Sequence, residues 1–334
     1  MTDKPKKLKI ALSSGDPNGI GLELILKTFS DPTLLSFCMP VVYANLEALR
    51  FYNHLLDTAV AIRHVTTPDD AKDNVVNVIN CWENSILPVP GKAESKGGKC
   101  AFASLEKAME DVIKGKMDVL VTGPINKDLI QSDSFNFPGH TEYLSSKTGG
   151  KNPLMLMCSG QLKIGVVTGH IPVNEIANVL SQNLILEKLE VMHQALRKDF
   201  GISAPKIAVL GLNPHAGDNG LLGKEEQTII GPAISKANKK DIDAIGPISA
   251  DGFFGSQAYL QYDGILAMYH DQGLIPFKAL SFGKGVNFTA GIPIIRTSPD
   301  HGVAYDLAGK NIASHTSYQA AVQLAMDLAN YTSR

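Results

Sequence analysis

Three histidines occupy similar positions along the chain and could share one ligand. His170, His215 and His270 each follow a short apolar run, and each stands near a glycine or proline. The intervals between them are too long for a local zinc finger, but loops that follow strands can meet at one sheet edge. Three neutral imidazoles with one open position suit a catalytic Zn²⁺ or a similar divalent ion. A hydrogen-bonding role in each separate loop is the alternative, and the pattern leaves both open.

Two aspartates stand close enough in sequence to serve such a site. Asp271 directly follows His270, and Asp251 lies in the segment ISADGFF. A carboxylate beside a ligand histidine can orient the imidazole or act as a general base. Helix capping is the alternative for Asp271, which precedes a short apolar segment. We predict both aspartates as catalytic residues and leave open which of them is the base.

A second group of residues is suited to phosphate oxygens. Lys278 in LIPFK and Arg296 in PIIRTS lie in apolar runs, where a cation is seldom placed without a partner. Lysine and arginine supply charge, while threonine and asparagine supply neutral donors. The predicted substrate-binding residues are His140, Thr141, Lys278, Asn287 and Arg296.

The elements that must position these residues alternate along the chain. Short apolar runs are separated by longer segments of helical period, which favours an α/β fold with a mainly parallel sheet. The predicted strands are Leu8–Leu12, Val41–Ala44, Val75–Ile79, Val119–Thr122, Leu154–Cys158, Ile164–Thr168, Ile207–Leu210, Ile265–Tyr269 and Ile292–Ile295. The predicted helices are Leu22–Phe29, Leu46–Leu55, Lys99–Lys114, Glu187–Phe200, Lys224–Ala237 and Tyr318–Leu328.

Five polar, glycine-bearing loops follow predicted strands. Their sequences are SGDPNGIG, TGPINK, TGHIP, GLNPHAG and MYHDQG. Ligands of open α/β sheets bind outside the carboxyl ends of the strands, so these loops predict one composite site. The glycine spacing of SGDPNGIGLE is not the G-x-G-x-x-G dinucleotide fingerprint, and this segment is interpreted as a tight strand-to-helix turn.

Composition excludes several classes of function. Lys plus Arg is 31 and Asp plus Glu is 33, so the net charge of −2 gives no indication of a nucleic-acid partner. No apolar stretch is long enough for a membrane span, and the N-terminus lacks the features of a signal peptide. The four scattered cysteines contain no C-x-x-C pair and predict reduced thiols in a cytoplasmic protein. A length of 334 residues favours two domains.

Taken together, the loops resemble the 4-hydroxythreonine-4-phosphate dehydrogenase family. The motifs that carry the resemblance are TGPINK, GHTEYL, GLNPHAG, LAMYHDQGLIPFK and GVNFTAGIPIIRTSPDHG, within a match that runs from Gly15 to Ala313. The resemblance implies that the three histidines bind the metal and that the substrate-binding set named above holds the phosphorylated substrate. It also implies a homodimer whose active site is shared between subunits. Our hypothesis is that His170 and His270 reach one ion from opposite subunits.

A second resemblance concerns the segment DHGVAYDLAGKNIA, Asp300–Ala313. It is similar to the loop of isocitrate and isopropylmalate dehydrogenases that holds the adenosine end of NAD, which implies that His301 and Asp306 bind the cofactor. The implied fold is a two-domain α/β/α arrangement. We expect a cofactor-side domain from residues 1–128 and 280–334, and a second domain, with metal ligands and dimer interface, from residues 129–279.

The implied reaction is oxidation of 4-phosphooxy-L-threonine by NAD, with NADP as the alternative cofactor, to 2-amino-3-oxo-4-phosphooxybutanoate. Decarboxylation then gives 3-amino-2-oxopropyl phosphate, a step in pyridoxal phosphate biosynthesis. One divalent ion per site, Zn²⁺, Co²⁺, Mn²⁺ or Mg²⁺, is implied as well. A dehydrogenase of erythronate or threonate 4-phosphate is the alternative within the family, and a metal-dependent phosphohydrolase is the alternative of another class. The chain departs from the family at Gly169 and Gly252, where threonine is usual.

Overall fold

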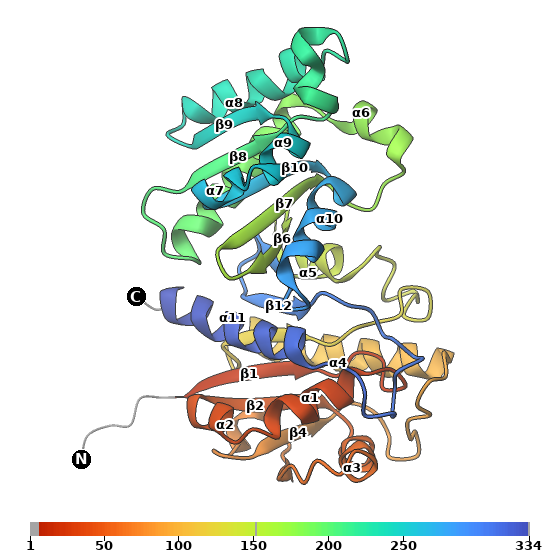
Figure 1. The fold of residues 1–334 in the computed structure, drawn as a ribbon. Coiled ribbons are helices and arrows are strands. Elements are labelled where there is room, and N and C mark those ends of the chain that lie inside the picture. Colours follow the sequence, from red (N-terminus) through yellow and green to blue (C-terminus); the bar gives the residue numbers. More distant parts are fainter. Residues whose placement is uncertain (1–6, 151, 333–334) are drawn as a thin grey trace, which may run out of the picture. The chain divides into compact units, whose positions relative to one another are not determined.

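The computed structural model describes residues 7–150 and 152–332, which form two compact units (Figure 1). The first unit contains the chain up to Gly139 together with Ile294–Ala329, and the second contains His140–Pro293 with the residues from Asn330. The sequence placed the two boundaries after residues 128 and 279. The assignment of cofactor binding to one domain and of the dimer interface to the other stays a prediction.

The first unit is a parallel sheet with helices. Its strand order is β3-β4-β2-β1-β5-β12, and every neighbouring pair within it is parallel. The strands are β1 (Leu8–Ser13), β2 (Cys38–Ala44), β3 (Ile62–His64), β4 (Val76–Asn80), β5 (Val119–Thr122) and β12 (Arg296–Pro299). The helices are α1 (Gly21–Phe29), α2 (Thr33–Phe37), α3 (Leu46–Leu55), α4 (Ser95–Ile113) and α11 (Thr316–Thr332). Because β2 and β5 are almost wholly buried, their sequences are mainly apolar.

The second unit has a mixed sheet in the order β11-β6-β7-β10-β8-β9. Strand β6 pairs antiparallel with β11 and β7, and the remaining pairs are parallel. The strands are β6 (Leu154–Ser159), β7 (Leu162–Thr168), β8 (Lys206–Leu210), β9 (Asp243–Ile248), β10 (Gly264–Tyr269) and β11 (Val286–Ala290). The helices are α5 (His140–Thr148), α6 (Ile176–Val179), α7 (Gln182–Lys198), α8 (Gly231–Asn238), α9 (Ala250–Gly255) and α10 (His270–Ser281).

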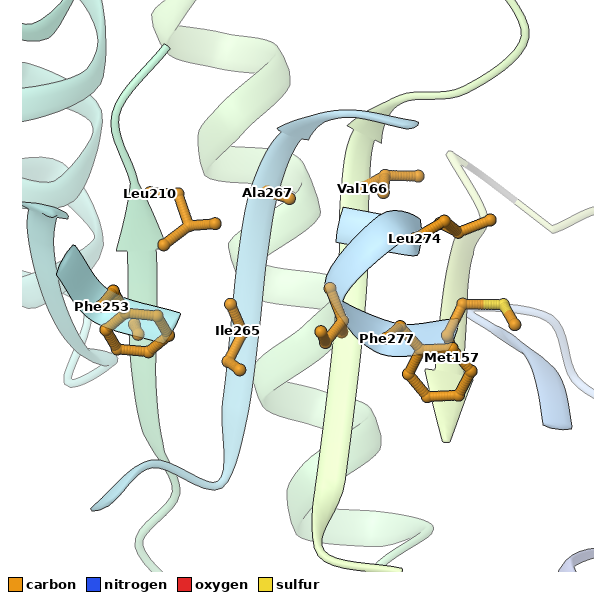
Figure 2. Close-up of a cluster of buried hydrophobic side chains, with 10 residues drawn as sticks. Met157, Val166, Leu210, Phe253, Ile265, Ala267, Leu274 and Phe277 are labelled. Carbon is orange, nitrogen blue, oxygen red and sulfur yellow. The ribbon is translucent and has the colours of Figure 1, made fainter. Parts of the chain in front are cut away.

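The core of the second unit follows the two-residue period of its strands. On one sheet face, alternate residues of β7, β8 and β10 pack against Phe253 of α9 and against Leu274 and Phe277 of α10 (Figure 2). On the other face, Gly165 and Gly264 leave room for side chains of α7, since an added Cβ at either would lie within 3 Å of a side-chain atom. The sheet therefore holds α10 close to the ends of β7 and β10.

Most predicted elements are confirmed, and one predicted strand is wrong. Ile292–Ile295 is a three-residue bend followed by one irregular residue, and the strand starts at Arg296. Gly291 has a φ of +84° and Pro293 cannot donate to a ladder, so the apolar run GIPII does not pair as a strand. The helix predicted at Lys224–Ala237 begins with a π-helical segment, Glu226–Ile230, before α8. The α/β class with mainly parallel strands is confirmed.

In the described part of the chain, no helix has both the length and the apolar character needed to cross a membrane. The cytoplasmic location stays a prediction.

A glycine inside α4 provides a test of the packing in the first unit. An added Cβ at Gly98 would lie 1.9 Å from the carbonyl oxygen of Leu129, which belongs to backbone and cannot rotate away. We expect Gly98→Ala to lower the free energy of unfolding by about 3 kcal/mol, measured by denaturant titration. Gly252→Ala is the matched control, because Gly252 also lies in a helix but has no neighbouring atom within 4 Å of its added Cβ. It should be neutral or stabilising by up to about 1 kcal/mol, and equal losses in both variants would contradict the packing argument.

Candidate active site

Three neighbouring strands bring the predicted metal-binding histidines to one sheet edge. Strand β10 lies between β7 and β8, and all three are parallel. His170 follows β7, His215 follows β8, and His270 follows β10 directly. The rings of His170 and His270 lie side by side, with centroids 5.4 Å apart. Two of the three predicted ligands therefore meet within one chain, which argues against the hypothesis that this pair comes from opposite subunits.

Asp271 holds the ring of His270. The first residue of α10 is His270, and its Nδ1 lies 2.7 Å from Oδ1 of Asp271. A carboxylate on Nδ1 favours the tautomer that leaves Nε2 as the free electron-pair donor, which is the arrangement common in metal-binding histidines. The capping alternative is wrong, because Tyr269 occupies the N-cap position and Asp271 lies in the first turn.

His215 lies in a loop of unusual backbone conformation. Consecutive residues from His215 to Asn219 all have φ values between +41° and +80°, in the left-handed region. Each non-glycine residue in that region costs roughly 1 kcal/mol or more, so the surroundings must hold the loop in place. Among the described residues no group of three or more His, Cys, Asp or Glu side chains forms a complete metal-binding cluster. His170 and His270 are paired in this structure, and His215 is not grouped with them.

A buried carboxylate, Glu226, restrains the His215 loop. Its Oε1 accepts hydrogen bonds from the backbone nitrogens of Leu212 at 2.8 Å and of Asn213 at 2.7 Å. Its Oε2 accepts from Nδ2 of Asn213 at 3.0 Å. The sequence prediction missed Glu226, because a lone glutamate in a helical segment normally indicates a solvent-facing position.

Gln272 was also missed, and it joins two of the loops. Its Nε2 donates to the carbonyl oxygen of Gly211 at 2.6 Å, and its Oε1 accepts from the backbone nitrogen of Met268 at 2.7 Å. The glutamine therefore connects the end of β10 with the start of the loop that carries His215.

Asp251 lies in the first turn of α9, where its Oδ1 accepts a hydrogen bond from the Ser249 hydroxyl at 2.5 Å. Hydrogen bonds from the Ser249 hydroxyl and from the Gly252 backbone lower the pKa of Asp251. A lowered pKa keeps this carboxylate ionised at neutral pH and makes it a weaker proton acceptor. Both aspartates stay predicted catalytic residues.

The predicted phosphate-binding residues of the second unit lie on three elements. His140 and Thr141 are the first two residues of α5, where helix N-termini favour anions. Lys278 is exposed on α10, and Asn287 lies half-buried in β11. The amide oxygen of Asn287 is buried and has no hydrogen-bond partner among the described residues. A buried acceptor of this kind is satisfied when a ligand donates to it.

Arg296 lies in the first unit and is only 2% exposed. Its Nε and Nη2 donate to Oγ1 of Thr122, at 3.1 and 2.6 Å. Thr122 opens the TGPINK motif at the end of β5, so this motif contributes a partner for the buried guanidinium. A phosphate contact of Arg296 stays a prediction.

The segment that resembles an NAD-binding loop lies in the first unit between β12 and α11. It contains no helix or strand, and it places His301 half-buried and Asp306 exposed. Tyr305 in this loop donates its hydroxyl to Oδ2 of Asp16 at 2.6 Å. Burial is the main cause of a raised pKa at Asp16, which lies in the SGDPNGIG segment and which the sequence prediction did not single out.

The chain is an α/β protein whose polar loops follow the carboxyl ends of parallel strands. Proteins of this class bind small molecules at that edge of the sheet. The chain belongs to the family of the pyridoxal phosphate biosynthetic protein PdxA, which it matches over residues 36–325. The family predicted from the motifs is thereby confirmed.

Relatives of known name support the same assignment. A 4-hydroxythreonine-4-phosphate dehydrogenase from Bacteroides thetaiotaomicron is 49% identical over 323 residues, which cover 96% of this chain and 89% of the relative. The crystal structure of 4-hydroxythreonine-4-phosphate dehydrogenase from Klebsiella pneumoniae is 34% identical, with a TM-score of 0.86 and coverage of 98% and 99% of the two chains. A terephthalate 1,2-cis-dihydrodiol dehydrogenase from Burkholderia xenovorans is 25% identical, with a TM-score of 0.64 and coverage of 96% and 98%.

Proposed function

We propose that this chain oxidises 4-phosphooxy-L-threonine, also named 4-hydroxythreonine 4-phosphate, with NAD as the hydride acceptor. The product, 2-amino-3-oxo-4-phosphooxybutanoate, then loses carbon dioxide to give 3-amino-2-oxopropyl phosphate. The observation that carries the proposal is the His170–His270 pair, with Asp271 on Nδ1 of His270, in a chain of the PdxA family. The 49% identical relative bears the name of this activity.

The residues at the sheet edge fit a divalent ion. His170 and His270 present two imidazoles, and Asp271 orients one of them as carboxylates commonly do at metal sites. We assign His215 as the third ligand. A bound Zn²⁺, Co²⁺, Mn²⁺ or Mg²⁺ would act as a Lewis acid toward the substrate's reacting oxygens. Asp271 keeps the His270 ring in place, and Asp271 and Asp251 are our two candidates for moving a proton.

The phosphate group of the substrate is assigned to residues of two kinds. Lys278 supplies charge, and His140 and Thr141 lie at the N-terminus of α5, where backbone N–H groups favour anions. The unpartnered amide oxygen of Asn287 can accept from a substrate hydroxyl or ammonium group. We assign the buried Arg296 to the same substrate.

The cofactor is assigned to the loop at Asp300–Ala313, through His301 and Asp306. An exposed carboxylate such as Asp306 can accept hydrogen bonds from ribose hydroxyls of the cofactor.

A homodimer with a shared active site is part of the proposal. An exposed apolar side chain follows each histidine by a few residues: Val173 is 80% exposed, Leu221 78% and Ile275 of α10 66%. Exposed large apolar side chains beside a functional site mark a candidate surface for a partner. A second copy of this chain is the partner we assign.

The reaction is tested by following NAD reduction with three substrates. 4-Phosphooxy-L-threonine should give the highest kcat/KM, above erythronate 4-phosphate and threonate 4-phosphate. A higher value for either sugar acid would favour the alternative dehydrogenase of sugar-acid catabolism. Release of inorganic phosphate without NAD reduction would favour the phosphohydrolase instead.

Glu226 gives a test of the metal site that does not depend on turnover. Glu226→Gln places an amide NH₂ group among backbone donors and should release the His215 loop. We expect the affinity for Zn²⁺ to fall about 10- to 100-fold, as for other changes behind a ligand histidine, measured by competition with a chromophoric chelator. Glu225→Gln is the control, because a glutamine there can still accept from Nδ2 of Asn213. Unchanged affinity in a folded Glu226→Gln variant would remove His215 from the ligand set.

A further inference from the structure

The SGDPNGIGLE segment does more than turn the chain from β1 into α1. Its backbone and side chains bond to the distant loop at Asp300–Ala313. The backbone nitrogen of Ile20 donates to the carbonyl oxygen of Val303 at 3.1 Å. An added Cβ at Gly19 would lie 2.1 Å from a side-chain atom of Val303, so only glycine allows this approach. The start of the loop is therefore held against the chain that precedes α1.

A buried ion pair on α1 holds the other end of the loop. Glu23 has a wholly buried side chain, and its Oε1 lies 2.8 Å from Nζ of Lys27, whose side chain is 14% exposed. Oε2 of Glu23 accepts from the backbone nitrogen of Gly309 at 3.1 Å. Nζ of Lys27 donates to the carbonyl oxygen of Ala313 at 2.9 Å. Each member of the pair thus binds one backbone group of the loop.

The conformation of the loop at Asp300–Ala313 depends on hydrogen bonds to residues outside the loop. Within it, three turn hydrogen bonds join residues 304–310, and the segment forms no helix or strand. Gly309, one of the two tied residues, and Asn311, which lies between them, have φ values of +73° and +60°, in the left-handed region. Asparagine tolerates that region better than most residues, yet the conformation still has to be stabilised from outside. The Glu23–Lys27 pair supplies that restraint at both Gly309 and Ala313.

We propose that Glu23 and Lys27 are positioning residues for the dinucleotide cofactor. They hold the loop in its binding conformation before the cofactor arrives, so that less ordering is needed on binding. Asp16 also contacts the loop, because its Oδ2 accepts a hydrogen bond from the Tyr305 hydroxyl. The SGDPNGIGLE segment therefore contacts the loop through Asp16 as well as through Glu23. The inference rests on the proposed function, in which this loop binds NAD.

The test replaces the ion pair as a unit. Glu23→Met with Lys27→Met removes both charges at similar volume, a change that is often neutral or stabilising for a buried pair. We expect the double variant to melt near the wild type but to bind NAD at least tenfold more weakly in calorimetric titrations of the metal-loaded dimer. KM for the phosphorylated substrate should change less than twofold. Hydrogen exchange at the Gly309 amide should become faster, because its acceptor is gone.

Two further variants separate positioning from general stability. Glu23→Gln keeps an oxygen that can accept from Gly309, so its NAD affinity should lie between the wild type and the double variant. Asp111→Asn is the matched control, since Asp111 is a buried carboxylate of the same unit that accepts from the Tyr43 hydroxyl at 2.9 Å. It should lower stability and leave NAD affinity unchanged.

Three outcomes of these titrations would contradict the positioning role or the proposed function. Wild-type NAD affinity in the folded double variant would overturn the positioning role while leaving the proposed function intact. Equal loss of NAD affinity in Asp111→Asn would also overturn it, because the effect would then be one of stability. A wild-type chain that does not bind NAD at all would overturn the proposed function and this inference with it.

Discussion

Treatment with a chelator is expected to abolish NAD reduction, and added Zn²⁺, Co²⁺, Mn²⁺ or Mg²⁺ should restore it. The expected loss is at least about a thousandfold, because a metal supplies several kcal/mol of charge stabilisation and each 1.36 kcal/mol changes the rate tenfold. His270→Ala should show a loss of similar size that added metal does not reverse. The measurement is the initial rate of NADH formation at saturating substrate.

The control for the histidine variant is a histidine outside the site. His64 is exposed in β3, so His64→Ala should retain full activity. His270→Ala should also keep most of its thermal stability, since its side chain is one-third exposed and packs little. Full turnover of metal-free protein would show that the metal assignment is wrong, whatever the variants do.

The sequence predicted the buried strands well because burial on both faces leaves a continuous apolar run. Strands β5, β7 and β10 are of this kind. It missed β9, whose sequence DAIGPI contains glycine and proline and which lies at the edge of its sheet order. It also missed α10, because Gly273 and Pro276 are residues that rarely occur inside a helix. Gly273 is there because an added Cβ would lie 3.0–3.2 Å from side chains of β7 and β10.

The sequence predicted single residues of the candidate site and the loops that carry them, but not the contacts between those residues. The pairing of His170 with His270 depends on the insertion of β10 beside β7, and strand order is a long-range property that spacing does not encode. Glu226 and Gln272 bind backbone groups, so their roles become visible only when the loop conformation is known. A turn-like sequence around Asp16 and Glu23 likewise gave no sign of the distant loop that it holds.

When two inactive variants are mixed, activity is expected to return if the two substituted metal ligands belong to different subunits of the same site. Because His170 and His270 are already paired within one chain, we now assign the third ligand, His215, to the partner in the dimer. His215→Ala and His270→Ala, each inactive alone, should therefore complement when their subunits are mixed and allowed to exchange. In a two-fold symmetric mixed dimer one site carries both lesions and the other carries none. Random pairing makes half of the dimers mixed, so up to about a quarter of wild-type activity should return.

The same experiment contains its own negative control. His170→Ala mixed with His270→Ala should stay inactive, because every site, in every dimer, lacks one member of a pair that comes from a single chain. Tagged subunits recovered by affinity purification establish that exchange has taken place in both mixtures. If the His215 mixture stays inactive despite proven exchange, all three ligands come from one chain and the shared metal site is wrong. If the His170 mixture regains activity instead, the two adjacent rings serve different sites, and the ligand pair inferred from their 5.4 Å separation is wrong.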